Sequence, residues 1–200
     1  MTTTVTQTQT QTQTRTPSQT QAQIEETLMT SERADLLETL QVHRNFLRTT
    51  TRELTDEQAR MRTTVSELTV GGLIKHVTET EAGWFDFIVS GPSQPEKNGK
   101  DFAEWGEQEF AERAAGFQLL PDETLAGVLA EYQRVAARTD DLVATVDLDS
   151  SWPLPEAPWF EPGARRSARR SLMHIVAETA QHAGHADIIR EALDGAKSMG

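Results

Sequence analysis

The sequence of 200 residues contains no cysteine, which excludes a disulfide framework and a thiol nucleophile supplied by the protein itself. Basic residues are also scarce: 19 Lys and Arg stand against 31 Asp and Glu, a net charge of −12. This charge argues against a nucleic-acid partner, because phosphates bind to basic surfaces. No apolar run approaches the roughly 18 residues of a membrane-spanning helix. We therefore expect no membrane partner and a cytoplasmic location.

Apolar residues are nearly missing from the N-terminal segment as well. Residues 1–23, MTTTVTQTQTQTQTRTPSQTQAQ, are almost entirely Thr and Gln. Such a tract cannot bury enough apolar surface to offset the entropy that is lost on ordering. It also lacks the basic and apolar regions of a secretory signal. We expect residues 1–25 to form a disordered tail and residues 26–200 to form one domain.

The rest of the chain has helical periodicity. Apolar residues recur every three or four positions in four long segments, which are residues 30–53, 69–90, 121–146 and 164–194. Shorter helices are expected within residues 54–62 and 101–115, and an ordered proline-rich loop over residues 151–163. No segment has the alternation that is typical of a strand. The pattern predicts an all-α fold, a four-helix bundle.

Residues that are favoured at helix ends mark where these helices begin and end. Ser31 and Thr69 are suited to cap the first and second long helices, and Thr55 the short helix between them. Pro121 is expected to open the third long helix. Gly195 is expected to end the fourth, because glycine readily adopts the left-handed conformation found there.

Histidines and a carboxylate gather on the fourth long helix. Glu178, His182 and His185 share the helix face that also carries apolar residues, so this face should point into the bundle. His76 lies at the edge of the apolar arc of the second long helix. Burying these groups is costly unless they are paired or bound to a metal. His76, Glu178 and His182 therefore predict a two-histidine, one-carboxylate metal site that leaves positions open for water or a substrate thiolate.

This metal site leaves several questions open. His185 is either a fourth ligand or an alternative to Glu178. Imidazole and carboxylate ligands suit Zn²⁺, Ni²⁺, Fe²⁺ or Mn²⁺, and the sequence does not separate these metals. A histidine on an apolar face is also commonly a hydrogen-bonded residue of the core or rim, and we keep that interpretation for His43 and His174. Glu81, near the apolar arc of its helix, is expected to be a carboxylate at the rim, and the alternative is a residue that supports the metal ligands.

Two stretches around these residues resemble one known family. SELTVGGLIKHVTETEAGWF (66–85) and SLMHIVAETAQHAGHADIIREALDG (171–195) resemble the DinB-like superfamily, in its mini-circle protein and mycothiol-dependent transferase branch. The resemblance extends over about residues 30–195. It implies an up-down-down-up bundle that holds a divalent metal between its helices, often in a homodimer.

The resemblance also implies a ligand set. Family members use one histidine of the second helix, which His76 matches, and two ligands four positions apart on the last helix. Many members have His-x-x-x-His there. This chain has Glu178 and His182 instead, as in relatives similar to the mycothiol-dependent maleylpyruvate isomerases, and the role of His185 is left unassigned.

Relatives in this superfamily include thiol S-transferases and isomerases that use mycothiol, bacillithiol or glutathione. The resemblance therefore implies a metal-dependent S-transferase with mycothiol as co-substrate, acting on a small electrophile. The arginine cluster at 165, 166, 169 and 170 is either the solvated start of a helix or an anion site, where it would meet a carboxylate of the thiol co-substrate. The alternatives are a non-catalytic metal-binding or stress-related bundle, and a purely structural bundle.

Overall fold

The computed structural model describes residues 17–92, 104–155 and 160–198. Four long helices dominate it: α1 (Pro17–Thr49), α3 (Val70–Ser90), α5 (Leu125–Thr145) and α6 (Ala168–Asp194). Two short helices, α2 (Asp56–Arg60) and α4 (Glu107–Ala115), and two short strands, β1 (Ser151–Pro153) and β2 (Arg165–Ser167), lie in the connections. The predicted all-α class is confirmed.

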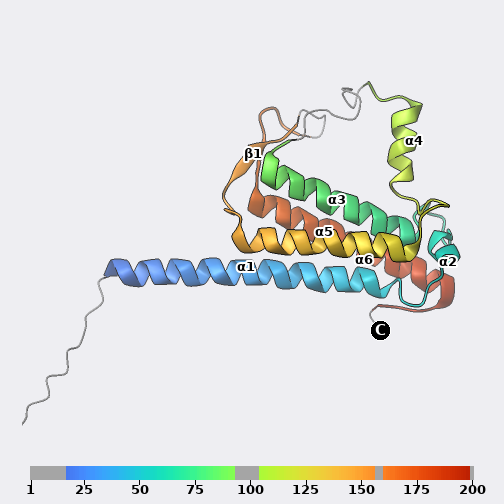
Figure 1. Cartoon of the computed structure of the whole chain (residues 1–200), viewed down its shortest axis with the longest axis horizontal. Coiled ribbons are helices and arrows are strands. Elements are labelled where there is room, and N and C mark those ends of the chain that lie inside the picture. Colours follow the sequence, from blue (N-terminus) through green and yellow to red (C-terminus); the bar gives the residue numbers. More distant parts are fainter. Residues whose placement is uncertain (1–16, 93–103, 156–159, 199–200) are drawn as a thin grey trace, which may run out of the picture.

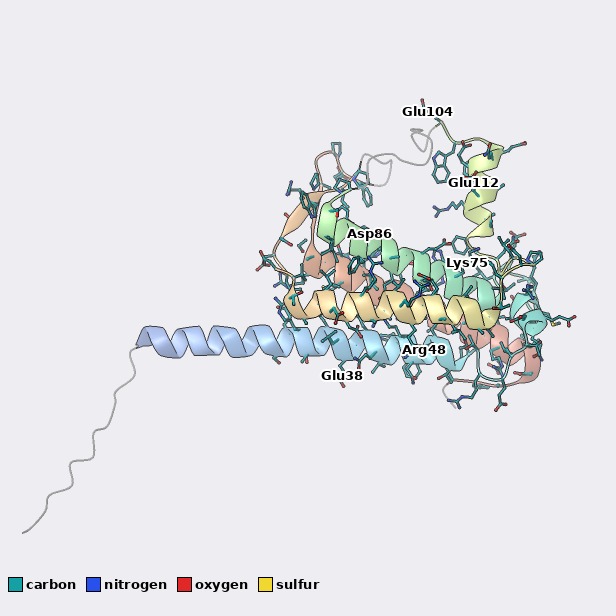
Figure 2. All side chains as sticks on the ribbon, viewed as in Figure 1. Glu38, Arg48, Lys75, Asp86, Glu104 and Glu112 are labelled. Atoms are coloured by element: carbon teal, nitrogen blue, oxygen red, sulfur yellow. The ribbon has the colours of Figure 1, made fainter. Side chains whose placement is uncertain are left out.

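The four long helices pack side by side in an up-down-down-up order. Figure 1 shows α1 and α6 running in one direction, with α3 and α5 running in the other. The consecutive helices α3 and α5 are parallel, so the chain must return along the bundle between them, and α4 lies in this connection. Figure 2 shows Glu38 on the side of α1 that is turned away from the other helices, which agrees with its exposure.

Side-chain caps fix where most of these helices begin. Thr69 accepts a hydrogen bond from the backbone N–H of Gly72, and Thr55 caps α2 in the same way through Gln58, both as expected. Helix α5 begins four residues after Pro121, because Thr124 provides the cap instead. Gly195 ends α6 in the left-handed conformation, with φ of 79°.

Helix α1 begins earlier than the sequence predicted. Residues 17–25, expected to belong to a disordered tail, are helical, and Ser31 lies inside the helix rather than at its cap. Gln, Ala and Glu are good helix formers and Pro17 suits a first helical position, so local propensity explains the extension. The remainder of the expected tail, residues 1–16, lies outside the described residues. The division into a tail and a domain stays a prediction.

A small hairpin replaces part of the expected loop at residues 151–163. Strands β1 and β2 pair antiparallel, with Trp152 opposite Arg166. The indole Nε1 of Trp152 donates a hydrogen bond to the backbone oxygen of Ile88 at 3.1 Å, which fastens the hairpin to the end of α3. Strands of three residues are too short to show an alternating pattern, so they could not be predicted from the sequence. Residues 156–159 of the expected loop lie outside the described residues.

The apolar faces of the long helices meet in two buried clusters that follow each other along the bundle. One is centred on Leu73, Val77, Tyr132 and Ile189, and the other on Leu40, Ile88, Val143 and Leu172. Burial of these side chains supplies the main stabilisation of the fold. Among the described residues, no helix combines the length and the apolar character needed to cross a membrane.

A buried ion pair lies within this apolar interior. Arg44 of α1 is 2 % exposed and Glu81 of α3 is 0 % exposed, and the guanidinium forms two hydrogen bonds with the carboxylate. Asp140 of α5 accepts a third hydrogen bond from Arg44 at 2.7 Å. The expectation that Glu81 lies at the rim was wrong, because its partner on α1 compensates for its burial.

Candidate metal centre

His76, Glu178 and His182 lie together between α3 and α6. Each residue offers one ligand atom, and these atoms lie within 4.8 Å of one another. His76 lies in the second turn of α3, whereas Glu178 and His182 are one turn apart on α6. His182 is buried, but the side chain of Glu178 is 27 % exposed. The cluster is therefore held by the bundle on one side and is open to solvent beside Glu178.

The imidazole of His76 is fixed by an aromatic contact. The ring of Phe117, which follows α4, stacks on it with 3.9 Å between centroids and 20° between planes. A close approach of backbones makes this contact possible: a Cβ at Gly72 would lie 1.9 Å from the carbonyl oxygen of Phe117. Glycine at position 72 thus allows the segment after α4 to lie against α3.

The environment keeps the imidazoles neutral. Burial lowers the pKa of His76 to about 4, and the repulsion that its protonated form would meet from protonated His182 and from Arg113 acts in the same direction. Burial also lowers the pKa of His182, against the opposing effect of the Glu178 carboxylate. A neutral imidazole carries the lone pair that a metal requires. Both rings are therefore ready to act as ligands at neutral pH.

Two more histidines contact the outer side of this cluster. His185 brings its Nδ1 within 3.3 Å of Nδ1 of His182, on the nitrogen that does not face Glu178. His174 brings its Nε2 within 3.6 Å of a Glu178 oxygen. His185 is not part of the three-residue cluster. Its position suits a residue that orients His182 through its second ring nitrogen.

The cluster fits a small divalent cation. Ligand atoms about 2.0–2.1 Å from a tetrahedral zinc ion would be about 3.4 Å apart. Nε2 of His182 already lies 3.5 Å from the nearer Glu178 oxygen, so this pair has the required separation. The ligand atom of His76 lies within 4.8 Å of the other two. The donors are two imidazoles and one carboxylate. With one side open, such a site has room for a substrate.

The four arginines that precede this cluster do not form one patch. Arg169 binds the carboxylates of Glu32 and Asp149. Arg165 donates a hydrogen bond to the backbone oxygen of Ser151 at 2.5 Å, inside the hairpin. The guanidinium of Arg166 lies 4.5 Å from the ring centroid of Trp84, whose ring in turn contacts His174. Arg166 therefore lies against the aromatic ring that contacts His174, while Arg165 and Arg169 bind groups of the surrounding structure.

Sequence reasoning missed Phe117, Arg113 and the positions of Trp84 and Arg166. Arg113 lies within a segment of weak periodicity and Phe117 follows it. Only the Gly-Gly pair at the start of α3 hints at a backbone approach. The Trp84 and Arg166 contact joins residues that are far apart in the sequence. No spacing rule reveals such a contact.

Comparison with known proteins agrees with this arrangement. The sequence matches the mycothiol S-transferase family over residues 35–195. No protein of curated function matches it significantly. A crystal structure of a conserved protein from Enterococcus faecalis has the same fold, with a TM-score of 0.58 and 13 % identity, covering 80 % of this chain and 96 % of that one. The chain is therefore a member of the mycothiol S-transferase family, in the DinB-like superfamily.

Proposed function

We propose that this protein is a metal-dependent S-transferase that joins a small thiol of the mycothiol type to a small electrophile. The observation that carries the proposal is the cluster of His76, Glu178 and His182, which is buried on one side and open on the other. Membership of the mycothiol S-transferase family supports the thiol as co-substrate. The chain has no cysteine, so the reacting sulfur must come from that co-substrate.

The three ligands set the charge of the site. His76 and His182 supply neutral lone pairs, and Glu178 supplies one negative charge. A divalent cation held there would lower the pKa of a bound thiol and favour its nucleophilic thiolate. One carboxylate leaves a net positive charge at the centre, so it would attract a thiolate more strongly than a site with two carboxylates.

Neighbouring side chains prepare the site. Phe117 covers one face of His76 and shields that ligand from water. His185 lies at the second ring nitrogen of His182 and would hold that ring in one orientation. The donors suit zinc, nickel, iron or manganese ions, and the geometry gives no preference among them. A homodimer and a cytoplasmic location stay predictions.

The test is thiol consumption by purified protein that has been loaded in turn with each of the four metals. Mycothiol and a small electrophile such as monochlorobimane are supplied, and conjugate formation is followed by fluorescence. We expect metal-dependent turnover that His76→Ala and His182→Ala each abolish. Arg134→Gln, which alters an exposed residue away from the cluster, is the control.

The outcomes separate the proposal from its rival. Metal binding without turnover by any thiol, including bacillithiol and glutathione, would favour a non-catalytic metal-binding bundle. Turnover that persists in both histidine variants would show that the cluster is not the reacting centre.

A further inference from the structure

His174 lies one turn before Glu178 on α6, on the opposite side of that ligand from His182. His174 is four positions before Glu178 and His182 is four positions after it, so the two rings flank the carboxylate on one face of the helix. Nε2 of His174 lies 3.6 Å from Oε1 of Glu178, and Nε2 of His182 lies 3.5 Å from Oε2. Each oxygen of the carboxylate thus faces a different imidazole.

The position of His174 is not that of a metal ligand. Within the described residues, the ligand atoms that lie within 4.8 Å of one another are those of His76, Glu178 and His182, and His174 contributes none. Oε2 of Glu178 is the oxygen on the side of His182, so a metal held between these two residues would use that oxygen. Oε1 then remains for His174.

The ring of His174 is held beside Glu178 by an aromatic contact. Trp84 of α3 meets this ring nearly perpendicularly, with 5.0 Å between centroids and 84° between planes. Trp84 in turn contacts the ring of Phe87 at 5.3 Å, and the guanidinium of Arg166 lies 4.5 Å from its ring centroid. The packing of α3 against α6 therefore orients the imidazole of His174 as well as supplying His76.

This arrangement determines which nitrogen of His174 carries the ring proton. A nitrogen that faces a carboxylate oxygen carries it, because a lone pair in that place would repel the negative charge. Nε2 of His174 is therefore a donor directed at Oε1 of Glu178. Ligating carboxylates commonly have such a donor on the oxygen that does not bind the metal. Without it, a carboxylate can turn and bind the ion through both oxygens, which fills one more coordination position.

We propose that His174 is a positioning residue, which in the metal-loaded protein donates a hydrogen bond to Oε1 of Glu178 and so confines this ligand to one oxygen. The position that the second oxygen would fill then stays open for the sulfur of the co-substrate. This role deepens the proposed function and rests on it only for the presence of a metal at the cluster. It does not require that a bound thiol reacts.

Loading the full-length protein with Co²⁺ tests the proposal, because the visible absorption of this ion weakens when its coordination number rises from four to five. We expect His174→Ala to lower the absorption per bound ion and to lower the Co²⁺ affinity by about tenfold or more. His174→Gln, whose side-chain amide also carries an N–H donor, should keep both close to wild type. Titration with Co²⁺, followed by visible absorption, measures both quantities.

Two further variants separate the hydrogen bond from packing. His174→Phe keeps an aromatic ring against Trp84 but has no donor, so it should behave like His174→Ala. His43→Ala is the matched control: His43 is also half-buried and contacts an aromatic ring, that of Phe46 at 6.3 Å, but it lies on α1 outside the cluster. It should leave the absorption and the affinity unchanged. Circular dichroism confirms that each variant is folded.

Several results would overturn the role of His174. Stronger absorption in His174→Ala would make His174 a fourth protein ligand. An unchanged spectrum and affinity in His174→Ala or His174→Phe, a loss in His174→Gln as large as in His174→Ala, or an equal loss in His43→Ala would show that no donor at position 174 is needed. Absence of thiol turnover concerns the proposed function alone, since these measurements use no thiol, whereas wild-type protein that binds no Co²⁺ would overturn both.

Discussion

The protonation of His76 differs between the folded and the unfolded chain. Its pKa is about 4 in the folded protein and 6.5 in a model compound. Between these values the unfolded chain binds the extra proton, so the free energy of unfolding decreases as the pH falls from about 6.5 to about 4. We predict that metal-free His76→Gln loses less stability over this range than wild type. Urea unfolding at pH 7 and pH 5 measures the difference, and equal losses would contradict the pKa assignment.

His185 is expected to position His182 rather than to bind the metal. Removing the partner of a ligand's second nitrogen commonly lowers metal affinity by about 10–100-fold, and His185→Ala should do the same. The absorption spectrum of the Co²⁺-substituted protein should keep its intensity and shape, because the coordination number is unchanged. A spectrum that changes to that of a different coordination number would instead make His185 a fourth ligand.

At the scale of the elements, Arg44 and Glu81 join α1 to α3, and Asp140 extends the contact to α5. Glu81→Ala would leave a buried guanidinium with one carboxylate that is 33 % exposed. We predict a loss of about 3–5 kcal/mol in the free energy of unfolding. The double variant Arg44→Met/Glu81→Leu should recover most of it, because no buried charge remains. Urea unfolding measures both, and a loss in the double variant as large as in the single one would contradict this account.

The position of the segment after α4 against α3 depends on a single glycine, Gly72. Gly72→Ala would place a methyl group 1.9 Å from the backbone oxygen of Phe117, so one of the two backbones must move. We predict a loss of about 1–3 kcal/mol in unfolding free energy together with weaker metal binding, because the Phe117 ring would no longer stack on His76. Gly83→Ala is the control, since that position is open. Unchanged metal affinity in Gly72→Ala would show that the stacking does not support the site.

The helices also show which parts of the structure could be predicted from the sequence. Periodicity and caps predicted α3 and the end of α6 well. Thr69 and Gly195 determine these helix ends through a hydrogen bond or backbone conformation that involves only residues nearby in the sequence. The same local rules placed His76, Glu178 and His182 on facing helix sides, and the structure brings these three together. Local rules failed for Glu81, whose partner lies 37 positions earlier, and for Arg166 against Trp84. Those contacts depend on how the helices pack, which no spacing reports.

At the scale of the whole molecule, a bound metal would couple α3 to α6. A ligand that binds only the folded chain stabilises it by about 2.7 kcal/mol at one hundred times its dissociation constant. We predict that Tm rises with Zn²⁺ concentration in wild type and stays constant in the His76→Ala/His182→Ala variant. Differential scanning fluorimetry measures both, and an equal rise in the two proteins would place the bound metal elsewhere.

The most direct test of the central claim is the metal content of the protein. Untagged protein, purified without a chelator, is analysed by plasma mass spectrometry beside the His76→Ala/His182→Ala variant. The account predicts about one divalent ion per chain in wild type and almost none in the variant. Wild-type protein without metal, even after incubation with Zn²⁺ or Ni²⁺, or a variant that keeps its metal, would contradict it.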